Sequence, residues 1–385
     1  MTTVGGLGTR PKTAWKVRLL VAAAFLGRSL LEGIRPSAEF LAPPARRIRP
    51  EPRVGLLAAG LLAVAALVWW VWRMQPWSAR FDEYRMLGGG DMPAALALGA
   101  DGAVWFTIDN SNALGVMRNG RMQRIPKGGD NLEPLGLAVA DDGSVWFTDP
   151  IADAIGHLTP DGAVESFPLP TKVTQFGRLA VATDGAVWAA DSWSNSLVRL
   201  DAAGLRLYPA STSGAAPFGV AADPRSGVWS TLQSAHKLIH IDSAGQLTEL
   251  EPPTRSSGPS DIAVDRSGVV WFVELRAGQI GRYANGAFDE FRLPRPQAGV
   301  TDLAVAPDGS VWFAELRAQR LGHLHDGVID EIALPRADAR PFGVRVDGAG
   351  NVWYTDLTGW LGMLPASQIR GGGVDPRRLV PWPRV

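Results

Sequence analysis

Short apolar runs alternate with Asp-Gly turns through most of this chain, and they do so at a fixed interval. The stretch Asp142-Gly143-Ser144-Val145-Trp146-Phe147-Thr148-Asp149 is one example, and versions of it recur around tryptophans that lie 41 or 42 residues apart. These tryptophans are Trp105, Trp146, Trp188, Trp229, Trp271, Trp312 and Trp353. A period of about 40 residues built from strands and turns is typical of a propeller blade, so this pattern predicts seven blades.

Each repeat carries the pattern of four strands. In one repeat, an apolar run at 136–140 leads through an Asp-Gly turn to the Val-Trp-Phe strand, and two further strands follow at 154–158 and 164–167. Asp and Gly suit tight hairpins because both tolerate positive φ. The inner strands are apolar on both faces, as expected of strands packed between neighbouring blades. The fourth strand alternates apolar and charged residues, as expected at a solvated edge.

The pattern also predicts how the ring closes. Six fourth strands follow their own tryptophans, at 122–125, 164–167, 205–208, 247–250, 288–291 and 329–332. The seventh repeat reaches a third strand at 361–364 and then breaks down at Pro365 and the glycines 371–373. Residues 81–86 resemble 288–293 and precede the first blade, so they are predicted to complete the last one. The predicted fold is an all-β, seven-bladed β-propeller over 81–365, closed by an N-terminal edge strand.

An uncharged apolar segment precedes the propeller. Residues 54–72 carry no charge and span about 29 Å as a helix, close to the roughly 30 Å hydrocarbon core of a bilayer. Tryptophans crowd its C-terminal end, as at a membrane interface. We therefore predict one transmembrane helix at 54–73. A buried globular helix is the alternative, and a cleavable signal peptide is disfavoured because the segment begins late in the chain.

Charge predicts the orientation of this anchor. Residues 1–53 hold ten basic and three acidic groups, a balance of +7 in a chain whose net charge is zero. The basic arm is predicted to be cytoplasmic, which places the propeller on the periplasmic or extracellular side of the cytoplasmic membrane. Within the arm, residues 13–34 are predicted to form an amphipathic helix that lies on the membrane surface or against a partner's helices, and a disordered arm is the alternative. Residues 35–52 and 74–80 are predicted linkers, and 366–385 a basic tail.

Composition excludes some classes of function. The chain has no cysteine, so it forms no disulfides and no thiolate metal sites. No basic field covers the propeller, which argues against nucleic acid as a partner.

Several motifs resemble the repeats of the virginiamycin B lyase family, also called the streptogramin lyases. They are Trp-Phe-Thr-Asp at 146–149, Ile-Gly-His-Leu at 155–158 and Glu-Ser-Phe-Pro-Leu-Pro at 165–170, with further matches at 280–282 and 290–294. The resemblance covers 81–365 and implies a seven-bladed propeller. It does not by itself imply lyase chemistry, because function depends on the site and not on the fold.

The resemblance implies a reaction to look for: opening of a cyclic peptide lactone by elimination, with a magnesium ion. The family uses a glutamate three residues after a blade tryptophan, with one histidine fourteen residues before it and another three residues after it. Glu274 and Glu315 match the glutamate. The histidine positions hold other residues: Ser260 and Ala277, and Thr301 and Ala318. The elimination needs a base, so the sequence predicts a lyase scaffold without the lyase histidines.

Acidic residues recur three positions after the blade tryptophans. They are Asp149, Asp191, Glu274, Glu315 and Asp356, interrupted by Ile108 and Leu232. Equivalent positions of a propeller meet around one mouth of its channel, where these oxygens could hold a divalent cation such as magnesium. The alternatives are a solvated rim that caps strand ends and pairs with arginines such as Arg178 and Arg345, or a surface for a basic partner. Phe176, Phe218 and Phe342 are predicted to line the same mouth, as packing or as binding residues.

Three functions remain open from the sequence. The favoured one is a non-catalytic, membrane-anchored accessory or docking subunit of an integral membrane protein complex, with no cofactor and with the lipid bilayer as its other contact. The second is a lyase- or hydrolase-like enzyme that uses a metal at the acidic mouth with different bases. The third is a binder of envelope glycans or peptides. A small-molecule substrate is not expected under the first.

Overall fold

The computed structural model describes residues 81–109, 111–128, 135–171 and 174–369. The chain divides into two units, 1–72 and 73–385, and every described residue belongs to the second. The predicted arm, transmembrane segment and linker, and the tail from residue 370 onward, lie outside the described residues. None of the described residues belongs to a helix with the length and apolar character that membrane crossing requires.

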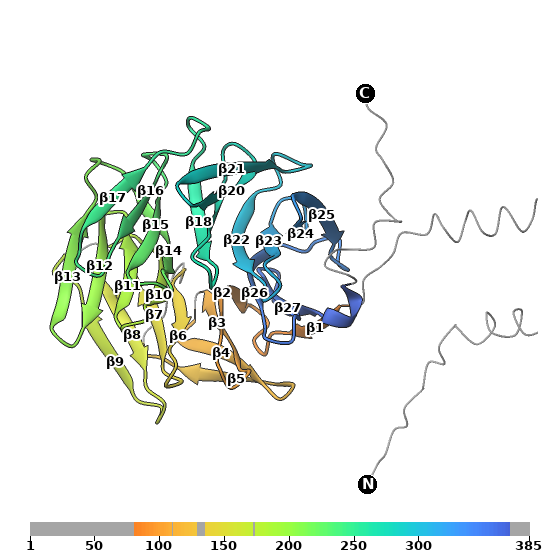
Figure 1. Cartoon of the computed structure of the whole chain (residues 1–385). Helices are drawn as coiled ribbons and strands as arrows, with labels where there is room; N and C mark the ends of the chain where they lie inside the picture. Colours follow the sequence, from red (N-terminus) through yellow and green to blue (C-terminus); the bar gives the residue numbers. More distant parts are fainter. Residues whose placement is uncertain (1–80, 110, 129–134, 172–173, 370–385) are drawn as a thin grey trace, which may run out of the picture. The chain divides into compact units, whose positions relative to one another are not determined.

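The described strands form seven four-stranded antiparallel sheets, which confirms the predicted seven-bladed propeller (Figure 1). In the first six blades the strands follow chain order from the channel outward. Blades 1 to 3 consist of β2(Met92–Leu98), β3(Val104–Asp109), β4(Ala113–Arg118) and β5(Arg121–Pro126); β6(Leu137–Val139), β7(Val145–Asp149), β8(Ala154–Leu158) and β9(Val164–Pro168); and β10(Phe176–Val181), β11(Val187–Asp191), β12(Ser196–Asp201) and β13(Gly204–Pro209). Blades 4 to 6 consist of β14(Pro217–Ala222), β15(Val228–Leu232), β16(Lys237–Ile241) and β17(Leu247–Leu250); β18(Pro259–Val264), β19(Val270–Glu274), β20(Gln279–Ala284) and β21(Ala287–Arg292); and β22(Val300–Val305), β23(Val311–Glu315), β24(Arg320–His325) and β25(Val328–Ala333).

The seventh blade is closed by the N-terminal strand, as predicted. Its own strands are β26(Pro341–Val346), β27(Val352–Asp356) and β28(Trp360–Leu364), and β1(Asp82–Arg85) supplies the fourth. β1 pairs antiparallel with β28, with Asp82 opposite Met363 and Arg85 opposite Trp360. A short 3-10 helix, η1(Ala366–Gln368), follows β28.

Strand direction gives the propeller two different faces. The connections from the first to the second strand and from the third to the fourth are the tight turns, and we call their side the turn face. The connections from the second to the third strand, and from each fourth strand to the next blade, lie on the opposite side, the loop face. Because Asp82 lies beside Met363 near the end of β28, the chain enters the propeller on the turn face.

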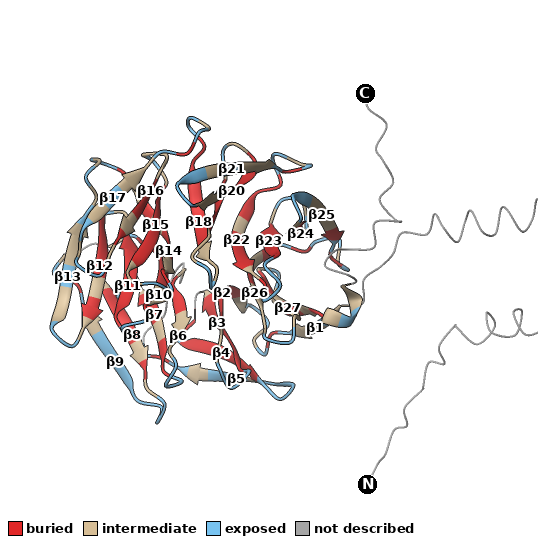
Figure 2. Ribbon diagram, viewed as in Figure 1, coloured by how far each residue is buried: buried red, intermediate tan, exposed pale blue. Residues whose placement is uncertain are grey.

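Burial follows the predicted order within each blade. The inner strands are largely buried and the outermost strands alternate, and β9 is exposed at four of its five residues (Figure 2). The repeated Ile-Gly motif has a packing reason. A Cβ on Gly156 would lie 2.2 Å from the ring of Phe147, so only glycine leaves room for that ring against the neighbouring strand. Five of the seven blade tryptophans are buried, and Trp146 and Trp353 are half-buried.

Candidate functional site

The five predicted carboxylates end the second strands of their blades, on the loop face. Four of them do not line an open mouth, because Asp191, Glu274, Glu315 and Asp356 are completely buried. Asp149 is half-buried. The carboxylates are therefore part of the junction between the strand ends and the loops that cover them.

The three aspartates hold the loops that follow them. The Asp149 Oδ1 accepts hydrogen bonds from the backbone N–H groups of Ile151 at 3.2 Å and Ala152 at 3.1 Å. Asp191 does the same for Trp193 at 3.1 Å and Ser194 at 3.3 Å. Asp356 accepts from the N–H of Thr358 at 2.8 Å. Each aspartate thus fixes the backbone of its own loop.

The two glutamates, which match the family's catalytic position, behave differently. Glu274 accepts a hydrogen bond from the Gln279 Nε2 at 2.6 Å, and burial raises its pKa. Neither carboxylate oxygen of Glu315 has a hydrogen-bond partner among the described residues. Burial raises the pKa of Glu315 to about 7, against the opposing charges of Arg295 and Arg320. Both side chains are closed off from any ligand that would approach the loop face.

The carboxylates also do not converge on one point. In the described part of the chain, no three acidic or histidine side chains are grouped as a metal site requires. Magnesium needs several oxygen ligands in near-octahedral geometry. The five carboxylates therefore do not offer magnesium a set of converging oxygen ligands.

The channel contains a group of charged side chains, of which only the arginines stood out in the sequence. On the second strand of each blade, the residue that follows the tryptophan pairs with an apolar residue of the first strand. The residue that precedes this apolar residue on the first strand lies toward the channel. In three blades that preceding residue is charged: Arg178, Asp261 and Asp302. Arg178 donates to the Asp261 Oδ2 at 3.2 Å and to the Thr301 carbonyl at 2.8 Å, and its guanidinium lies 5.5 Å from the Phe342 ring centre. One side chain from blade 3 thereby contacts blades 5, 6 and 7.

A second arginine completes this channel cluster, which we define as Arg178, Asp261, Asp302 and Arg345. The Arg345 guanidinium contacts the Asp302 carboxylate at 2.8 Å. Burial raises the pKa of Asp261 to about 7, opposed by Arg178 and reinforced by the neighbouring Asp302. The pKa of Asp302 is lowered, because the two arginines outweigh the effect of its burial. The two arginines expected to pair with the rim carboxylates, Arg178 and Arg345, pair instead with Asp261 and Asp302, whereas the rim carboxylate of Asp356 pairs with Arg336.

A sequence signal for the cluster does exist. In four blades a threonine two residues after the tryptophan anchors the first strand; for example, the Thr231 Oγ1 accepts from the Gly219 N–H at 2.8 Å and donates to the Ser260 carbonyl at 2.9 Å. In blades 3, 5 and 6 this threonine is replaced by Ala190, Val273 and Ala314. These are the blades that carry Arg178, Asp261 and Asp302, whereas Arg345 belongs to blade 7, which keeps its threonine. The two exchanges occur together in blades 3, 5 and 6, so comparing the repeats position by position would have identified three of the four cluster residues.

The phenylalanines occupy different environments. Phe176 is buried in the packing between blades 2 and 3. Phe342 is half-buried beneath Arg178, and Phe218 is half-buried. The three rings therefore do not share one environment.

The histidines on third strands are packing residues. His157, His240 and His323 lie opposite blade tryptophans, with ring centres 3.8 Å from Trp146, 4.4 Å from Trp229 and 4.1 Å from Trp312. In blades 3 and 5 an arginine covers the tryptophan from the same position. Burial lowers the pKa of His323 to about 4, so this imidazole is neutral near pH 7.

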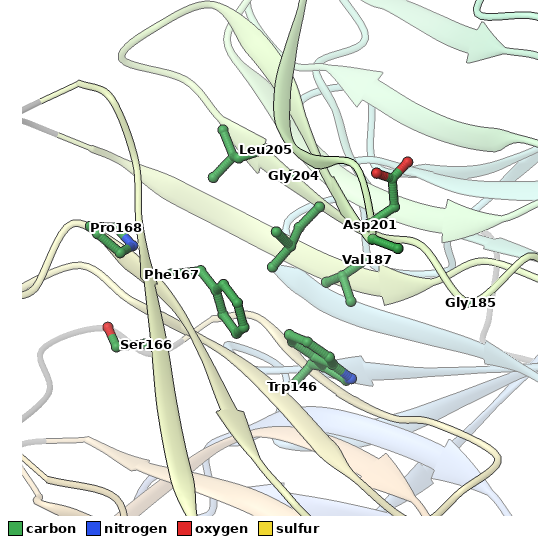
Figure 3. Close-up of a pocket in the computed structure, with 11 residues that line it drawn as sticks. Trp146, Ser166, Phe167, Pro168, Gly185, Val187, Asp201, Gly204 and Leu205 are labelled. Atoms are coloured by element: carbon green, nitrogen blue, oxygen red, sulfur yellow. The ribbon is translucent and has the colours of Figure 1, made fainter.

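A cavity of about 590 Å³ lies elsewhere, between the outer parts of blades 2 and 3 (Figure 3). Trp146 and Phe167 form one wall, and Val187 and Leu205 lie across from them. It opens near the turns Gly185 and Gly204, on the turn face. None of the five predicted carboxylates lines it, so it is separate from the loop-face position that matches the family's glutamate.

Comparison with known proteins gives the family. Residues 79–364 match the model of the virginiamycin B lyase family. The chain belongs to this family. A search of curated proteins gave no match.

Solved structures of family members have the same fold. A catalytically inactive virginiamycin B lyase from Staphylococcus aureus, with quinupristin, is 25% identical with a TM-score of 0.71, and the match covers 74% of this chain and 98% of that one. A streptogramin B lyase is also 25% identical, with a TM-score of 0.70 and coverage of 74% and 96%. YCF48 bound to D1 peptide, at 13% identity, a TM-score of 0.59 and coverage of 74% and 95%, shares the fold alone.

Proposed function

We propose that this protein is a non-catalytic member of the virginiamycin B lyase family, a membrane-anchored propeller that serves as a docking subunit of a membrane protein assembly. The main support for the proposal is the burial of the two side chains at the position that matches the family's glutamate. Glu274 and Glu315 are retained there, yet both are completely buried. A carboxylate without access to a ligand cannot act on a bound lactone.

The residues at the histidine positions support the same conclusion. Ala277 and Ala318 offer no titratable group. The Thr301 Oγ1 donates to the Phe342 carbonyl at 2.7 Å, so this hydroxyl joins blade 6 to blade 7. The Ser260 hydroxyl is buried without a hydrogen-bond partner among the described residues, and a serine hydroxyl alone is a poor base near pH 7.

The anchor is the second part of the proposal. The uncharged segment 54–72 after an arm of charge +7 favours a single pass with the arm inside and the propeller outside. Protease added to intact spheroplasts should digest the propeller and spare the arm, and a protected propeller would contradict this topology.

The activity assay is the first test. The purified full-length protein is expected not to open a streptogramin B lactone, with or without magnesium. General acid–base catalysis contributes a factor of about 10² to 10⁴, and neither histidine position offers such a group. The staphylococcal lyase is the positive control. Lactone opening that Glu274→Gln or Glu315→Gln abolishes would favour the metal-dependent enzyme instead.

The partner assay is the second test. After gentle solubilisation of native membranes, the tagged full-length chain is expected to co-purify with a defined integral membrane complex. A chain that carries the arm and anchor but lacks 81–365 is the control, and it should recover much less of that complex. Equal recovery by both chains would show that the propeller does not dock.

A further inference from the structure

The loops between second and third strands have four residues in blades 2 to 6 and three in blade 7, and the second residue of each is exposed. That position lies five residues after each blade tryptophan, and outside blade 1 its occupants are Ile151, Trp193, Ser234, Arg276, Arg317 and Thr358. Variable side chains on a fixed repeat backbone are how repeat proteins build binding faces. We call these six residues the display positions.

Blades 2 and 3 present large apolar groups at this position. Trp193 is 64% exposed and Ile151 is 54% exposed. Their loops are held in place, because Asp191 and Asp149 accept hydrogen bonds from the N–H groups of these same two residues. An exposed tryptophan on a fixed backbone loses little conformational freedom on binding, and tryptophan is among the commonest residues in interface hot spots.

Blades 5 and 6 present arginines at the same position. The backbone N–H of Arg276 donates to the Ser257 carbonyl at 2.9 Å, and that of Arg317 donates to the Ala298 carbonyl at 2.9 Å. A Cβ on Gly258 would lie 2.8 Å from the Arg276 Cγ, and one on Gly299 would lie 2.6 Å from the Arg317 Nε. Glycine in the linker thus lets each arginine lie across its own blade in the same way.

These two arginines have no ion pair within the described residues. Several other arginines of the propeller are paired, such as Arg282 with Asp289 at 2.7 Å and Arg206 with Asp201 at 2.6 Å. The glutamates of blades 5 and 6 are buried beneath the loops with raised pKa values, which reduces the negative charge available to Arg276 and Arg317. The loop face therefore has an unneutralised positive side and an apolar side.

We propose that the loop face is the docking surface of this protein and that it binds an acidic polypeptide segment with a large apolar side chain. This inference rests on the docking function proposed above and assigns it to one face. Arg276 and Arg317 attract the acidic residues, and Trp193 with Ile151 receives the apolar one. The chain enters the propeller on the opposite side, the turn face.

Site-specific crosslinking in native membranes tests the assignment. A photoreactive amino acid replaces Trp193 in the full-length chain, and the matched control carries it at Val328, a turn-face residue that is 56% exposed. We expect Trp193 to give a crosslink and Val328 to give none, and sequencing of the crosslinked peptide to show a net acidic segment. The double variant Arg276→Glu, Arg317→Glu should lose this crosslink. Its control is Arg121→Glu, Arg266→Glu, which changes two exposed arginines on the turn face and should keep it.

The loss of peptide affinity in a Trp193 variant shows whether this side chain contributes to binding or only lies near the bound peptide. Trp193→Ala is expected to weaken binding of a synthetic peptide with the crosslinked sequence by about 30-fold, and Val328→Ala should leave it unchanged. A crosslink from Val328 alone, a neutral or basic crosslinked peptide, or no crosslink from either position would overturn the inference. If the complex still co-purifies through 81–365 in those cases, the docking function stands and only the face is wrong.

Discussion

Replacing β1 with a Gly-Ser run of equal length is expected to lower the melting temperature of the propeller by about 10 °C or more. The change leaves the connection to the preceding chain intact and removes only the strand. β28 then becomes an open edge, and the seventh blade loses the outer strand that joins the two ends of the ring. A cost of about 5 kcal/mol is expected, at the upper end of what local changes produce.

The contacts of β1 explain this cost. The buried Tyr354 hydroxyl donates to the Glu83 carboxylate at 2.9 Å, and Arg336 contacts the same carboxylate at 3.1 Å. A buried hydroxyl that loses a charged partner costs about 1–3 kcal/mol. Tyr84 stacks on Trp353 with ring centres 6.4 Å apart, so that ring would become more exposed.

The matched control keeps these contacts. Asp82 and Arg85 are exposed at the two ends of the strand, and replacing both with serine should change the melting temperature by only a degree or two. Thermal unfolding followed by circular dichroism makes the comparison. Similar melting temperatures for the strand replacement and the parent would show that β1 does not close the ring.

The fold could be predicted because its signal is repeated. The tryptophans, the Asp-Gly turns and the counted fourth strands each occur many times, so chance matches cancel out. The pairing of β1 with β28 followed from a missing strand at one end of the pattern and a spare one at the other. Ring closure could be predicted from the number of strands in each repeat alone, without knowledge of side-chain contacts.

The site was harder to predict because it depends on side-chain direction and burial. Recurrence correctly placed Asp149 and Asp191 at strand ends on one face, but it did not indicate that Asp191 points into its own loop. The pairing of Arg178 depends on reaching across the channel to Asp261, which is 83 residues away in the chain. Repeat periodicity records what blades share, whereas this contact exists because three blades differ from the rest.

Arg178→Met is expected to destabilise the propeller by about 3–5 kcal/mol, because it removes one partner from a buried ionic cluster. Methionine retains much of the volume but none of the donors. The carbonyls of Leu135 and Thr301 lose hydrogen bonds of 3.1 and 2.8 Å, and Asp261 loses its cation. Denaturant unfolding at a series of pH values measures the cost.

The pH dependence of this cost has a definite sign. A carboxyl group whose pKa is higher in the folded chain than in the unfolded chain makes folding less favourable as the pH rises between the two values. For Asp261 in the parent that window runs from its ordinary value of 3.8 to about 7. Without Arg178 the folded pKa rises further, so the window extends upward. The penalty of Arg178→Met should therefore be larger near about pH 9 than near about pH 6.

The two neighbouring aspartates provide the discriminating control. With a pKa of about 7, Asp261 is mostly protonated near about pH 6 and can donate to Asp302, so Asp261→Asn should cost little there and should stabilise the fold relative to the parent above about pH 7, where the parent must ionise this buried group. Asp302 stays ionised because both arginines lower its pKa. Asp302→Asn should cost about as much as Arg178→Met, because it leaves the Arg345 guanidinium without its carboxylate. Equal costs for the two asparagine variants, or an Arg178→Met penalty that is the same at both pH values, would show that the channel cluster does not hold its charges in this way.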